Sequence, residues 1–442
     1  MIAPERRGLV ISAPHSGSGK TVFTLGLLRA LTRRSLPVSS AKSGPDFIDP
    51  QFHAAATGSA CQTLDAWATD PDSLRAGAYG HAPADGTLVV EGAMGLFDGS
   101  ANGAGSTADL AAILGLPVVL VIDVSRQAQS VAALIHGFRS YRPDVTISGV
   151  VLNRVASPRH ERMIARALEA MDATILGALT RDEHLALPSR HLGLVQAVEN
   201  PDLEAFIARA AEKVEAETDV TAVLDGAAPL PARSAPAARL APLGQNIAIA
   251  DDLAFTFLYP HLTETWRCQG AAIQWFSPLA DESPPEDCDA VFLPGGYPEL
   301  HAGRLASATG FRAGMRHAAE NGRAIYGECG GYMVLGEALI DADGHSHPML
   351  DLLPLVTSFA EPRRHLGYRA LEPLAASPWQ VPLAAHEFHY SSAIIEGPGE
   401  PLFAARDAEG AVLGPIGLRQ GSVFGSYAHV IGPGPATVAR AF

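Results

Sequence analysis

The feature of this sequence that most constrains its fold is the stretch VISAPHSGSGKTVFT at residues 10–24. A continuous apolar run leads into a Gly/Ser loop, and Lys20 and Thr21 then open a segment with helical periodicity. Backbone N–H groups of such a loop, together with the N-terminus of the next helix, surround phosphate oxygens. Lys20 would contact the β- and γ-phosphates and Thr21 would bind Mg²⁺. The pattern predicts a nucleotide-binding loop made of Ser16, Gly17, Ser18, Gly19, Lys20 and Thr21.

The loop departs from the usual motif at one position, because Pro14 stands where the first Gly is expected. An ordinary strand–turn–helix connection is therefore the alternative interpretation. We prefer a nucleotide site because a strand pattern precedes the loop and a helix pattern follows it.

Short apolar runs alternate with helical patterns in the first half of the chain, as they do in parallel sheets covered on both faces. The expected strands are Leu9–Ala13, Leu88–Glu91, Val118–Asp123 and Ile147–Asn153, and the expected helices include Thr21–Thr32, Val131–Ser140 and Glu161–Met171. The second half repeats the pattern, with strands expected at Asn246–Ala250, Ala290–Leu293 and Arg323–Tyr326. We expect an α/β protein with two domains, each a mostly parallel β-sheet flanked by helices.

A segment rich in Ala and Pro, residues 224–245, has no apolar periodicity and is typical of an inter-domain linker. This divides the chain into a nucleotide-dependent domain at 1–223, the linker at 224–245, and a second domain at 246–442. Each of the two domains is long enough to bury its own core.

Composition excludes several classes of function. A formal net charge of −15 argues against a general nucleic-acid binder, which needs a basic surface. No apolar run has the length of about 18 residues that a membrane span requires, and the N-terminus does not have the pattern of a secretory signal. The four cysteines form no CxxC pair, which favours a reducing, cytoplasmic location and disfavours a cysteine-bound metal.

Polar residues at strand ends are candidates for ligand binding, because ligands of parallel sheets bind at the carboxyl ends of the strands. Lys42, Asp46 and Asp49 are expected in a Gly-Pro turn, and Glu91 ends an apolar strand where a carboxylate can bind Mg²⁺. These acids could instead be helix caps or solvated turn residues, the commonest role of acids in turns. For Asp98 and Asp123 the two interpretations are balanced, and Asn153 is a candidate for reading an adenine edge.

The stretch RAIYGECGGYMVLG at residues 323–336 places Cys329 between glycines, after a strand and before a helix. That geometry exposes a nucleophile, and a helix N-terminus lowers the pKa of a thiol, so we expect a reactive Cys329. A packed core cysteine is the alternative. His429, in GSYAHV, is a candidate base, and the Pro-Gly-Gly turn of FLPGGYPEL offers N–H groups for an oxyanion. His386 and His389 could bind a metal, but we do not expect it, because no third ligand is near in the sequence.

Taken together, SGSGKT, KSGPDFIDP, VEGAMGLFDG, LNRV, LPGGYPE, GECGGYM, HEFHYS and GSYAH resemble the glutamine-dependent cobyrinate or hydrogenobyrinate a,c-diamide synthases, in the same order and over nearly the whole chain. The first domain resembles a dethiobiotin-synthetase-type ATPase. The second resembles a class I (triad) glutamine amidotransferase.

The resemblance implies that Cys329 attacks the glutamine amide, that His429 transfers protons, and that backbone groups near Gly296 and Gly330 stabilise the oxyanion. Tyr390 and Ser391 would hold glutamine. The remaining implied roles are a metal site of Thr21, Asp46 and Glu91 and a corrinoid carboxylate site of Lys42, Asp46, Asp49 and Asp98. The implied reaction is ATP- and Mg²⁺-dependent amidation of the c and a acetate side chains through acyl phosphates. Its partners are small molecules (corrinoid, ATP and glutamine), with neither nucleic acid nor membrane, and a homodimer is one option for its assembly.

Two features depart from the expected pattern. Ile431 occupies the position, two residues after His429, at which many triad amidotransferases carry an acid, so the third triad member stays open. The negative net charge should repel a polycarboxylate, so a local basic patch is needed, for which the candidates are Arg126, Arg154, Arg159 and Arg190. Three alternatives stay open, namely cobyric acid synthase, Ni-sirohydrochlorin a,c-diamide synthase, and a regulatory or partitioning-type ATPase that is not an enzyme of amidation.

Overall fold

The computed structural model describes residues 5–185, 189–190, 193–194, 196–231, 238–374 and 376–434. The chain divides into two compact units, Met1–Ala237 and Ala238–Phe442. Among the described residues, no helix is both long enough and apolar enough to cross a bilayer.

The main sheet of the first unit has the strand order β3-β2-β4-β1-β5-β6-β7, all parallel, and β10 pairs antiparallel with β1. Its strands are β1 (Arg6–Ser12), β2 (Val38–Ser43), β3 (Gln62–Leu64), β4 (Gly86–Glu91), β5 (Val118–Asp123), β6 (Ile147–Val155), β7 (Ile175–Thr180) and β10 (Ala228–Pro229). A separate two-stranded ladder joins β8 (Ser189–Arg190) to β9 (Gly193–Leu194).

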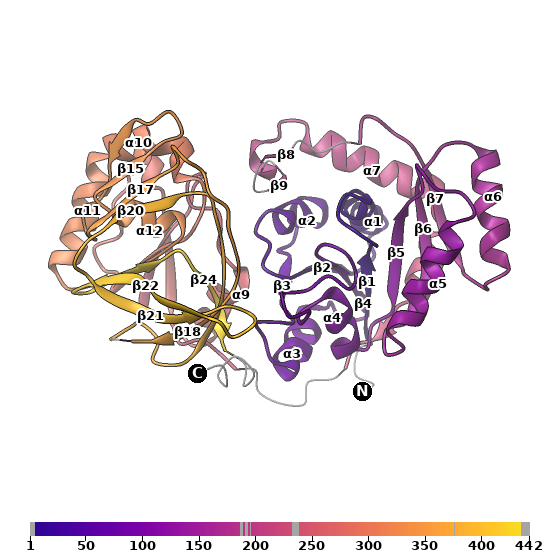
Figure 1. Ribbon diagram of the computed structural model, residues 1–442, viewed down its shortest axis with the longest axis horizontal. Helices are drawn as coiled ribbons and strands as arrows, with labels where there is room; N and C mark the ends of the chain where they lie inside the picture. Colours follow the sequence, from indigo (N-terminus) through magenta and orange to yellow (C-terminus); the bar gives the residue numbers. More distant parts are fainter. Residues whose placement is uncertain are drawn as a thin grey trace. The chain divides into compact units, whose positions relative to one another are not determined.

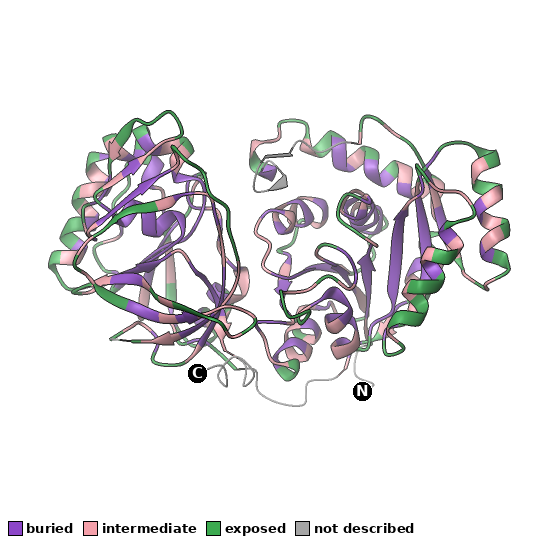
Figure 2. Ribbon diagram, in the orientation of Figure 1, coloured by how far each residue is buried: buried purple, intermediate pink, exposed green. Residues whose placement is uncertain are grey.

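The helices of this unit are α1 (Lys20–Arg33), α2 (Asp49–Thr57), α3 (Pro71–His81), α4 (Thr107–Leu114), α5 (Val131–Tyr141), α6 (Pro158–Glu169), α7 (Leu203–Glu217) and α8 (Val220–Asp225), with a 3₁₀ turn at Ala197–Glu199. Helices α1, α2 and α7 cover one face of the sheet, and α3, α4 and α5 cover the other (Figure 1). This arrangement follows from right-handed crossovers between parallel strands. Because both faces are covered, the central strands are buried throughout, and the exposed surface lies on the outer sides of the helices (Figure 2).

The ten-stranded sheet of the second unit has the order β12-β11-β13-β14-β23-β22-β21-β18-β19-β24. Strands β12 (Ala272–Phe276), β11 (Asn246–Ala250), β13 (Ala290–Leu293), β14 (Ala324–Glu328) and β23 (Val423–Ser426) run parallel to one another. The antiparallel part consists of β22 (Val412–Gln420), β21 (Glu400–Arg406), β18 (His365–Pro373), β19 (Leu383–His389) and β24 (His429–Pro433). The sheet is therefore mixed.

A smaller sheet in the same unit has the order β16-β15-β17-β20 and is made of β15 (Ala338–Ile340), β16 (Ser346–Pro348), β17 (Leu355–Ser358) and β20 (Ser392–Glu396). The helices of the unit are α9 (Pro260–Cys268), α10 (Ala302–Ser307), α11 (Thr309–Glu320) and α12 (Gly330–Leu335), with 3₁₀ turns at Pro278–Ala280 and Pro298–His301.

The α/β class expected from the sequence is confirmed, and each strand named from its apolar run is present within a few residues. Lys42 was expected in a turn, but it lies on strand β2, which the polar stretch SSAKS did not reveal. Part of the segment 224–245, which was expected to be a linker, packs on the first unit: Ala228–Pro229 pairs with β1, and the Leu230 N–H donates to Arg6 O at 2.8 Å. The boundaries of the three-part division stay a prediction.

Candidate active sites

The Gly/Ser loop after β1 has the shape expected of a phosphate-binding loop. Gly17 and Gly19 adopt φ of 82° and 93°, in the left-handed region that favours glycine, and α1 begins directly afterwards at Lys20. The Ser18 hydroxyl donates to His15 O at 2.8 Å, and Lys20 Nζ donates to Met94 O at 3.1 Å. Lys20 is thus held across the mouth of the loop by the turn that follows β4.

Asn153, at the end of β6, lies against this loop. Its Nδ2 donates to Ser18 O at 2.8 Å, and its Oδ1 accepts the N–H of Arg154 at 2.9 Å. A Cβ on Gly19 would lie 2.0 Å from Asn153 Nδ2, so only glycine fits there. The geometry gives Asn153 a role in holding the loop, and its reading of adenine stays a prediction.

Next to the loop lies a cluster of opposite charges, which we call the lysine–carboxylate cluster: the buried Lys42 and Glu91 with the partly buried Asp46 and Asp49. Lys42 Nζ lies 2.5 Å from Asp49 Oδ2, 2.9 Å from Glu91 Oε1 and 3.8 Å from Asp46 Oδ2. Asp46 Oδ1 also accepts the N–H groups of Ile48 and Asp49, so it helps to start α2. The structure therefore brings together the lysine and three of the acids named from the sequence.

Glu91 is the centre of this network. Its Oε1 also accepts the Thr21 hydroxyl at 2.7 Å, and its Oε2 lies 2.7 Å from His53 Nε2. His53 is fully buried, and Cys61 Sγ lies 3.4 Å from its Nδ1. Sequence reasoning missed His53, although its spacing of four residues from Asp49 on a helix was the signal that could have found it.

Neighbouring charges keep Glu91 and Lys42 of the cluster in their ionised forms in spite of burial. Burial alone would raise the pKa of Glu91, but Lys42 and His53 outweigh it and hold that pKa well below its usual value. Burial would likewise lower the pKa of Lys42, but Asp49 and Glu91 raise it well above its usual value. Burial and Asp46 raise the pKa of Asp49 to about 6. Burial and the neighbouring Lys42 lower the pKa of Lys20.

The oxygen atoms at this place suit a magnesium ion. Thr21 offers a hydroxyl, and Asp46 and Glu91 offer carboxylates, which are the hard ligands that Mg²⁺ prefers. The chemistry of these groups is compatible with Mg²⁺, and the metal set expected from the sequence stays a prediction.

The other polar candidates of the first unit have different surroundings. Asp98 is exposed, and its Oδ2 accepts the Gly95 N–H at 2.9 Å, so it closes its own turn. Arg154 pairs with Asp123 at the ends of β6 and β5, and Arg126 and Arg159 are exposed. The side chain of Arg190 lies outside the described residues. A basic patch for the substrate stays a prediction.

In the second unit, Cys329 stands on a sharp turn between β14 and α12. Its φ of 47° and ψ of −102° are unusual for a residue with a side chain, and such strain concentrates at functional sites. A Cβ on Gly331 would lie 1.9 Å from Leu293 O, so the glycines allow the turn to pack on β13. The elbow expected from the sequence is present.

Two expectations about Cys329 are wrong for this structure. Its side chain is buried, not exposed. Burial and the carboxylate of Glu299 raise the pKa of its thiol far above the usual value, although the Gly330 N–H favours the thiolate. The helix N-terminus alone does not offset desolvation, so the thiol needs a base to take its proton.

His429 follows β23 by three residues, and β23 is the parallel neighbour of β14, which ends just before Cys329. The turn of Gly295 and Gly296 lies against both segments: a Cβ on Gly295 would be 2.2 Å from His429 Cε1, and one on Gly330 would be 2.9 Å from Gly296 N. Burial, together with His386 and His389, lowers the pKa of His429 to about 3, so the imidazole is neutral and needs a nearby negative charge to stabilise its protonated form. The two candidate catalytic residues and the two oxyanion glycines thus belong to one edge of the sheet.

The HEFHYS segment, residues 386–391, lies close to His429. The Ser391 hydroxyl donates to Tyr427 Oη at 3.1 Å, and His389 Nδ1 lies 2.9 Å from Ser391 O. Tyr427 stacks on the His389 ring at 3.8 Å. Burial raises the pKa of Tyr427, and Cys329 adds to this rise. Tyr390 is half-buried, and its carbonyl accepts the Arg363 N–H at 2.9 Å. The placement of Ser391 is consistent with a glutamine site, which stays a prediction for both residues.

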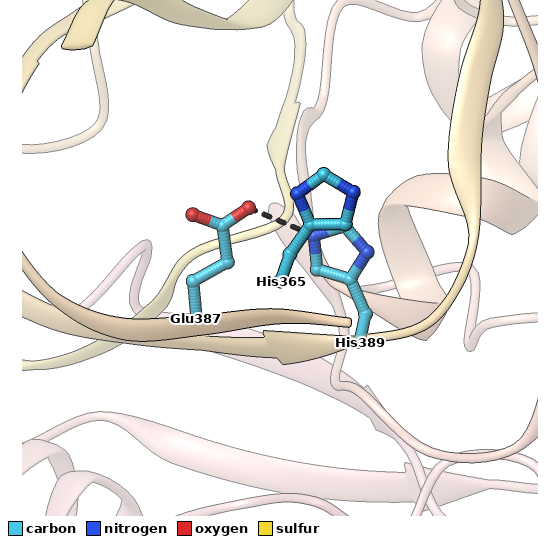
Figure 3. Close-up of side chains that lie close together, drawn as sticks. All are labelled: His365, Glu387 and His389. Carbon is cyan, nitrogen blue, oxygen red and sulfur yellow. Dashed lines mark hydrogen bonds and ion pairs between the residues drawn. The ribbon is translucent and has the colours of Figure 1, made fainter. Parts of the chain in front are cut away.

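Glu387 and His389 of this segment gather with His365 (Figure 3), so the structure brings a third group, His365, to His389 from a distant part of the sequence. His389 Nε2 lies 2.7 Å from Glu387 Oε1. The two imidazole rings are stacked with planes 7° apart, so their in-plane lone pairs do not converge on one point. Arg369 Nε lies 2.6 Å from Glu387 Oε2, which further opposes a cation there. The arrangement is better suited to orienting His389 than to binding a shared ion.

Comparison with known proteins assigns each of the two units to a domain family. Residues 9–195 match the family described as the CobQ/CobB/MinD/ParA nucleotide binding domain, and residues 246–435 match the CobB/CobQ-like glutamine amidotransferase domain. A protein of Brucella anthropi named hydrogenobyrinate a,c-diamide synthase is 56% identical over 96% of this chain and 98% of its own length. The chain belongs to the hydrogenobyrinate a,c-diamide synthase family.

Relatives with the same name include one from a Sinorhizobium species, 55% identical over 96% of this chain and 98% of its own, and one from Agrobacterium fabrum, 50% identical over 97% and 99%. Like the family, the protein is a ligase that makes carbon–nitrogen bonds with glutamine as the nitrogen donor. The lysine–carboxylate cluster belongs to the nucleotide-binding domain, and Cys329 and His429 belong to the amidotransferase domain.

Proposed function

We propose that this protein converts the c and a acetate carboxylates of hydrogenobyrinate to amides, with consumption of ATP and glutamine, in the biosynthesis of cobalamin. The observation that carries the proposal is the identity of 50–56% to hydrogenobyrinate a,c-diamide synthases along almost the full length of both chains. The two sites described above contain the groups that this reaction requires.

In the first step, a substrate carboxylate oxygen attacks the γ-phosphorus of ATP, ADP leaves, and an acyl phosphate forms. A carboxylate is a poor electrophile, and phosphorylation provides a good leaving group. Lys20 and Lys42 supply positive charge beside the transferring phosphoryl group. Thr21, Asp46 and Glu91 would hold Mg²⁺, which would supply positive charge to the phosphate oxygens. Lys42 is held in place by Asp49 and Glu91, so its ammonium group is oriented before substrate arrives.

In the second unit, the sulfur of Cys329 attacks the side-chain amide carbon of glutamine, and His429 takes the thiol proton and gives it to the departing ammonia. Backbone N–H groups near Gly296 and Gly330 stabilise the oxyanion. Water then cleaves the γ-glutamyl thioester to glutamate and restores the thiol. Because the thiol is buried and its pKa is raised, we expect thiolate formation to be coupled to glutamine binding.

Ammonia attacks the carbonyl carbon of the acyl phosphate, and phosphate leaves to give the amide. Free ammonia at neutral pH is mostly ammonium, so its production by the same protein supplies the reactive form where it is used. Two such cycles give the a,c-diamide. The proposal places the enzyme in the cytoplasm, where ATP and reduced thiols are available. Light scattering of the purified protein tests whether it assembles as a homodimer.

Mass spectrometry of the product tests this function. The purified protein would be incubated with ATP, Mg²⁺ and glutamine, together with hydrogenobyrinate or its cobalt-containing counterpart cobyrinate. We expect two replacements of OH by NH₂ in hydrogenobyrinate, each accompanied by one ADP. Hydroxylamine in place of glutamine should trap the acyl phosphate as a hydroxamate. Amidation only of a corrinoid that is already a diamide would instead indicate a cobyric acid synthase and contradict the proposal.

A further inference from the structure

Glu328, the residue directly before Cys329, points at the segment that carries the candidate base. It is the last residue of β14, and its side chain is buried. Its Oε1 accepts the N–H of Val430 at 3.0 Å, and its Oε2 lies 3.8 Å from His429 Nδ1. One carboxylate thus contacts both the backbone after His429 and the imidazole ring itself.

The position of Glu328 is set by the sheet and not by a loop. Strands β14 and β23 pair in parallel, with Glu328 opposite Ser426, three residues before His429. The backbone N–H of Cys329 donates to Ser426 O at 2.9 Å, which extends this pairing to the nucleophile. The carboxylate and the thiol therefore lie at the end of β14, and the imidazole follows three residues after the end of its neighbour β23.

Many triad amidotransferases carry an acid two residues after the catalytic histidine, but this position is Ile431 here and has no carboxylate. Ile431 is buried on β24, and its carbonyl accepts from His261 Nε2 at 2.7 Å. A base histidine needs a group at Nδ1 that selects the tautomer with a free Nε2 lone pair and stabilises the imidazolium. Glu328 supplies a carboxylate at this place, because its Oε2 lies 3.8 Å from His429 Nδ1.

We propose that Glu328 is the residue that positions His429 and stabilises its imidazolium form, so that the nucleophile and the orienting acid are adjacent in the sequence. This inference rests on the proposed glutaminase role of Cys329 and His429. Glu328 Oε2 lies 3.8 Å from Nδ1, so a small shift of the imidazole brings Nδ1–H within hydrogen-bond distance of the carboxylate. That bond leaves Nε2 free to take the Cys329 proton, and the carboxylate offsets the positive charge that the transfer creates on the ring.

The surroundings make this role sensitive to pH. Burial raises the pKa of Glu328 to about 8, although the Val430 N–H and the Tyr326 hydroxyl favour its ionised form. The groups that face His429 are Glu328, His386, His389 and Glu387. The orienting function requires ionised Glu328, so glutamine-driven turnover should rise as the pH increases through about 8.

The test compares Glu328→Gln, Glu328→Asp and the control Glu400→Gln, which removes an exposed carboxylate paired with Arg419 in the same unit. Each full-length variant would be assayed with glutamine and, separately, with ammonium salt as nitrogen donor. For Glu328→Gln we expect kcat with glutamine to fall by about 10²–10⁴-fold, with an unchanged KM for glutamine and no rise of kcat with pH. Glu328→Asp should keep part of the activity and the pH dependence, and the control should match the wild type.

Ammonia-driven amidation by the same preparations shows whether the variants are folded. If Glu328→Gln keeps wild-type kcat and pH dependence with glutamine, the inference is wrong while the proposed function stands. If the wild type itself uses neither nitrogen donor, the proposed function fails instead. Should Glu328→Gln not fold, the rate at which a glutamine-mimicking alkylating agent modifies wild-type Cys329 remains decisive, because a rate that is flat between pH 6 and pH 9 contradicts the role of Glu328.

Discussion

Lys42 and Glu91 face each other as register partners on strands β2 and β4, and Lys42 Nζ lies 2.9 Å from Glu91 Oε1. Both side chains are almost completely buried, so neither charge is shielded by solvent. A buried ion pair of this kind adds little net stability, but it holds an ammonium group and a carboxylate at defined places. In this enzyme those places adjoin the phosphate-binding loop through the contact of Glu91 with Thr21.

Removal of the Lys42 charge should destabilise the protein. Lys42→Met removes the ammonium group that contacts both Asp49 and Glu91 and leaves Glu91 with His53. Loss of one partner of a buried ion pair costs about 3–5 kcal/mol. Urea denaturation of the full-length chain measures this cost. Arg75→Met, which breaks a partly exposed pair with Asp72, should cost about 1 kcal/mol or less. If the two substitutions lower the free energy of unfolding equally, Lys42 is not needed to stabilise the buried carboxylates, and the prediction is wrong.

His53 should make the stability depend on pH. Burial alone would lower its pKa, but Cys61 and Glu91 outweigh burial and raise it from 6.5 to about 10. Because the folded state binds this proton more tightly, the stabilisation is complete below pH 6.5 and is lost as the pH rises through about 10. The free energy of unfolding of the wild type should therefore fall over this window by more than that of His53→Gln. His136→Gln, at an exposed histidine of the same unit, should follow the wild type.

The two units should divide the reaction between them. Cys329→Ala should lose amidation with glutamine and keep amidation with ammonium salt, because only the release of ammonia needs the thiol. Lys20→Ala should lose both reactions, because the acyl phosphate no longer forms. Product mass for each nitrogen donor measures this. Cys268→Ala removes an exposed cysteine and should change neither reaction. Loss of both reactions in Cys329→Ala, with an unchanged circular dichroism spectrum, would contradict the division.

A single methyl group beside the candidate base should impair glutamine hydrolysis. In Gly295→Ala the new Cβ would lie 2.2 Å from His429 Cε1, so the imidazole must move. We expect a fall in kcat with glutamine of about 100-fold, since small displacements of catalytic groups have effects of that order, and no loss with ammonium salt. Gly303→Ala is the matched control, because its new Cβ would meet no heavy atom closer than 3.8 Å. Normal glutamine-driven turnover by Gly295→Ala would show that the ring can shift without cost.

The elements that the sequence predicted well are those specified by local patterns. The apolar runs of β1, β4 and β5 and the loop before Lys20 are contiguous, so periodicity and glycine content were sufficient. The elbow at Cys329 was likewise evident from its flanking glycines. The antiparallel strands β18–β22 were not predicted, because their pairing depends on partners distant in the chain.

The sequence by itself determined which residues are chemically competent, since the nucleotide loop, the acids after the strands and the thiol between glycines can be read from short motifs. Only the tertiary structure decided how these groups interact. It placed Lys42 on a strand beside Glu91, added His53 to their network, buried Cys329 and brought Glu328 to His429. The physical reason is that burial and the distances between charges arise from residues far apart in the chain, and these two quantities set the pKa values on which the chemistry depends.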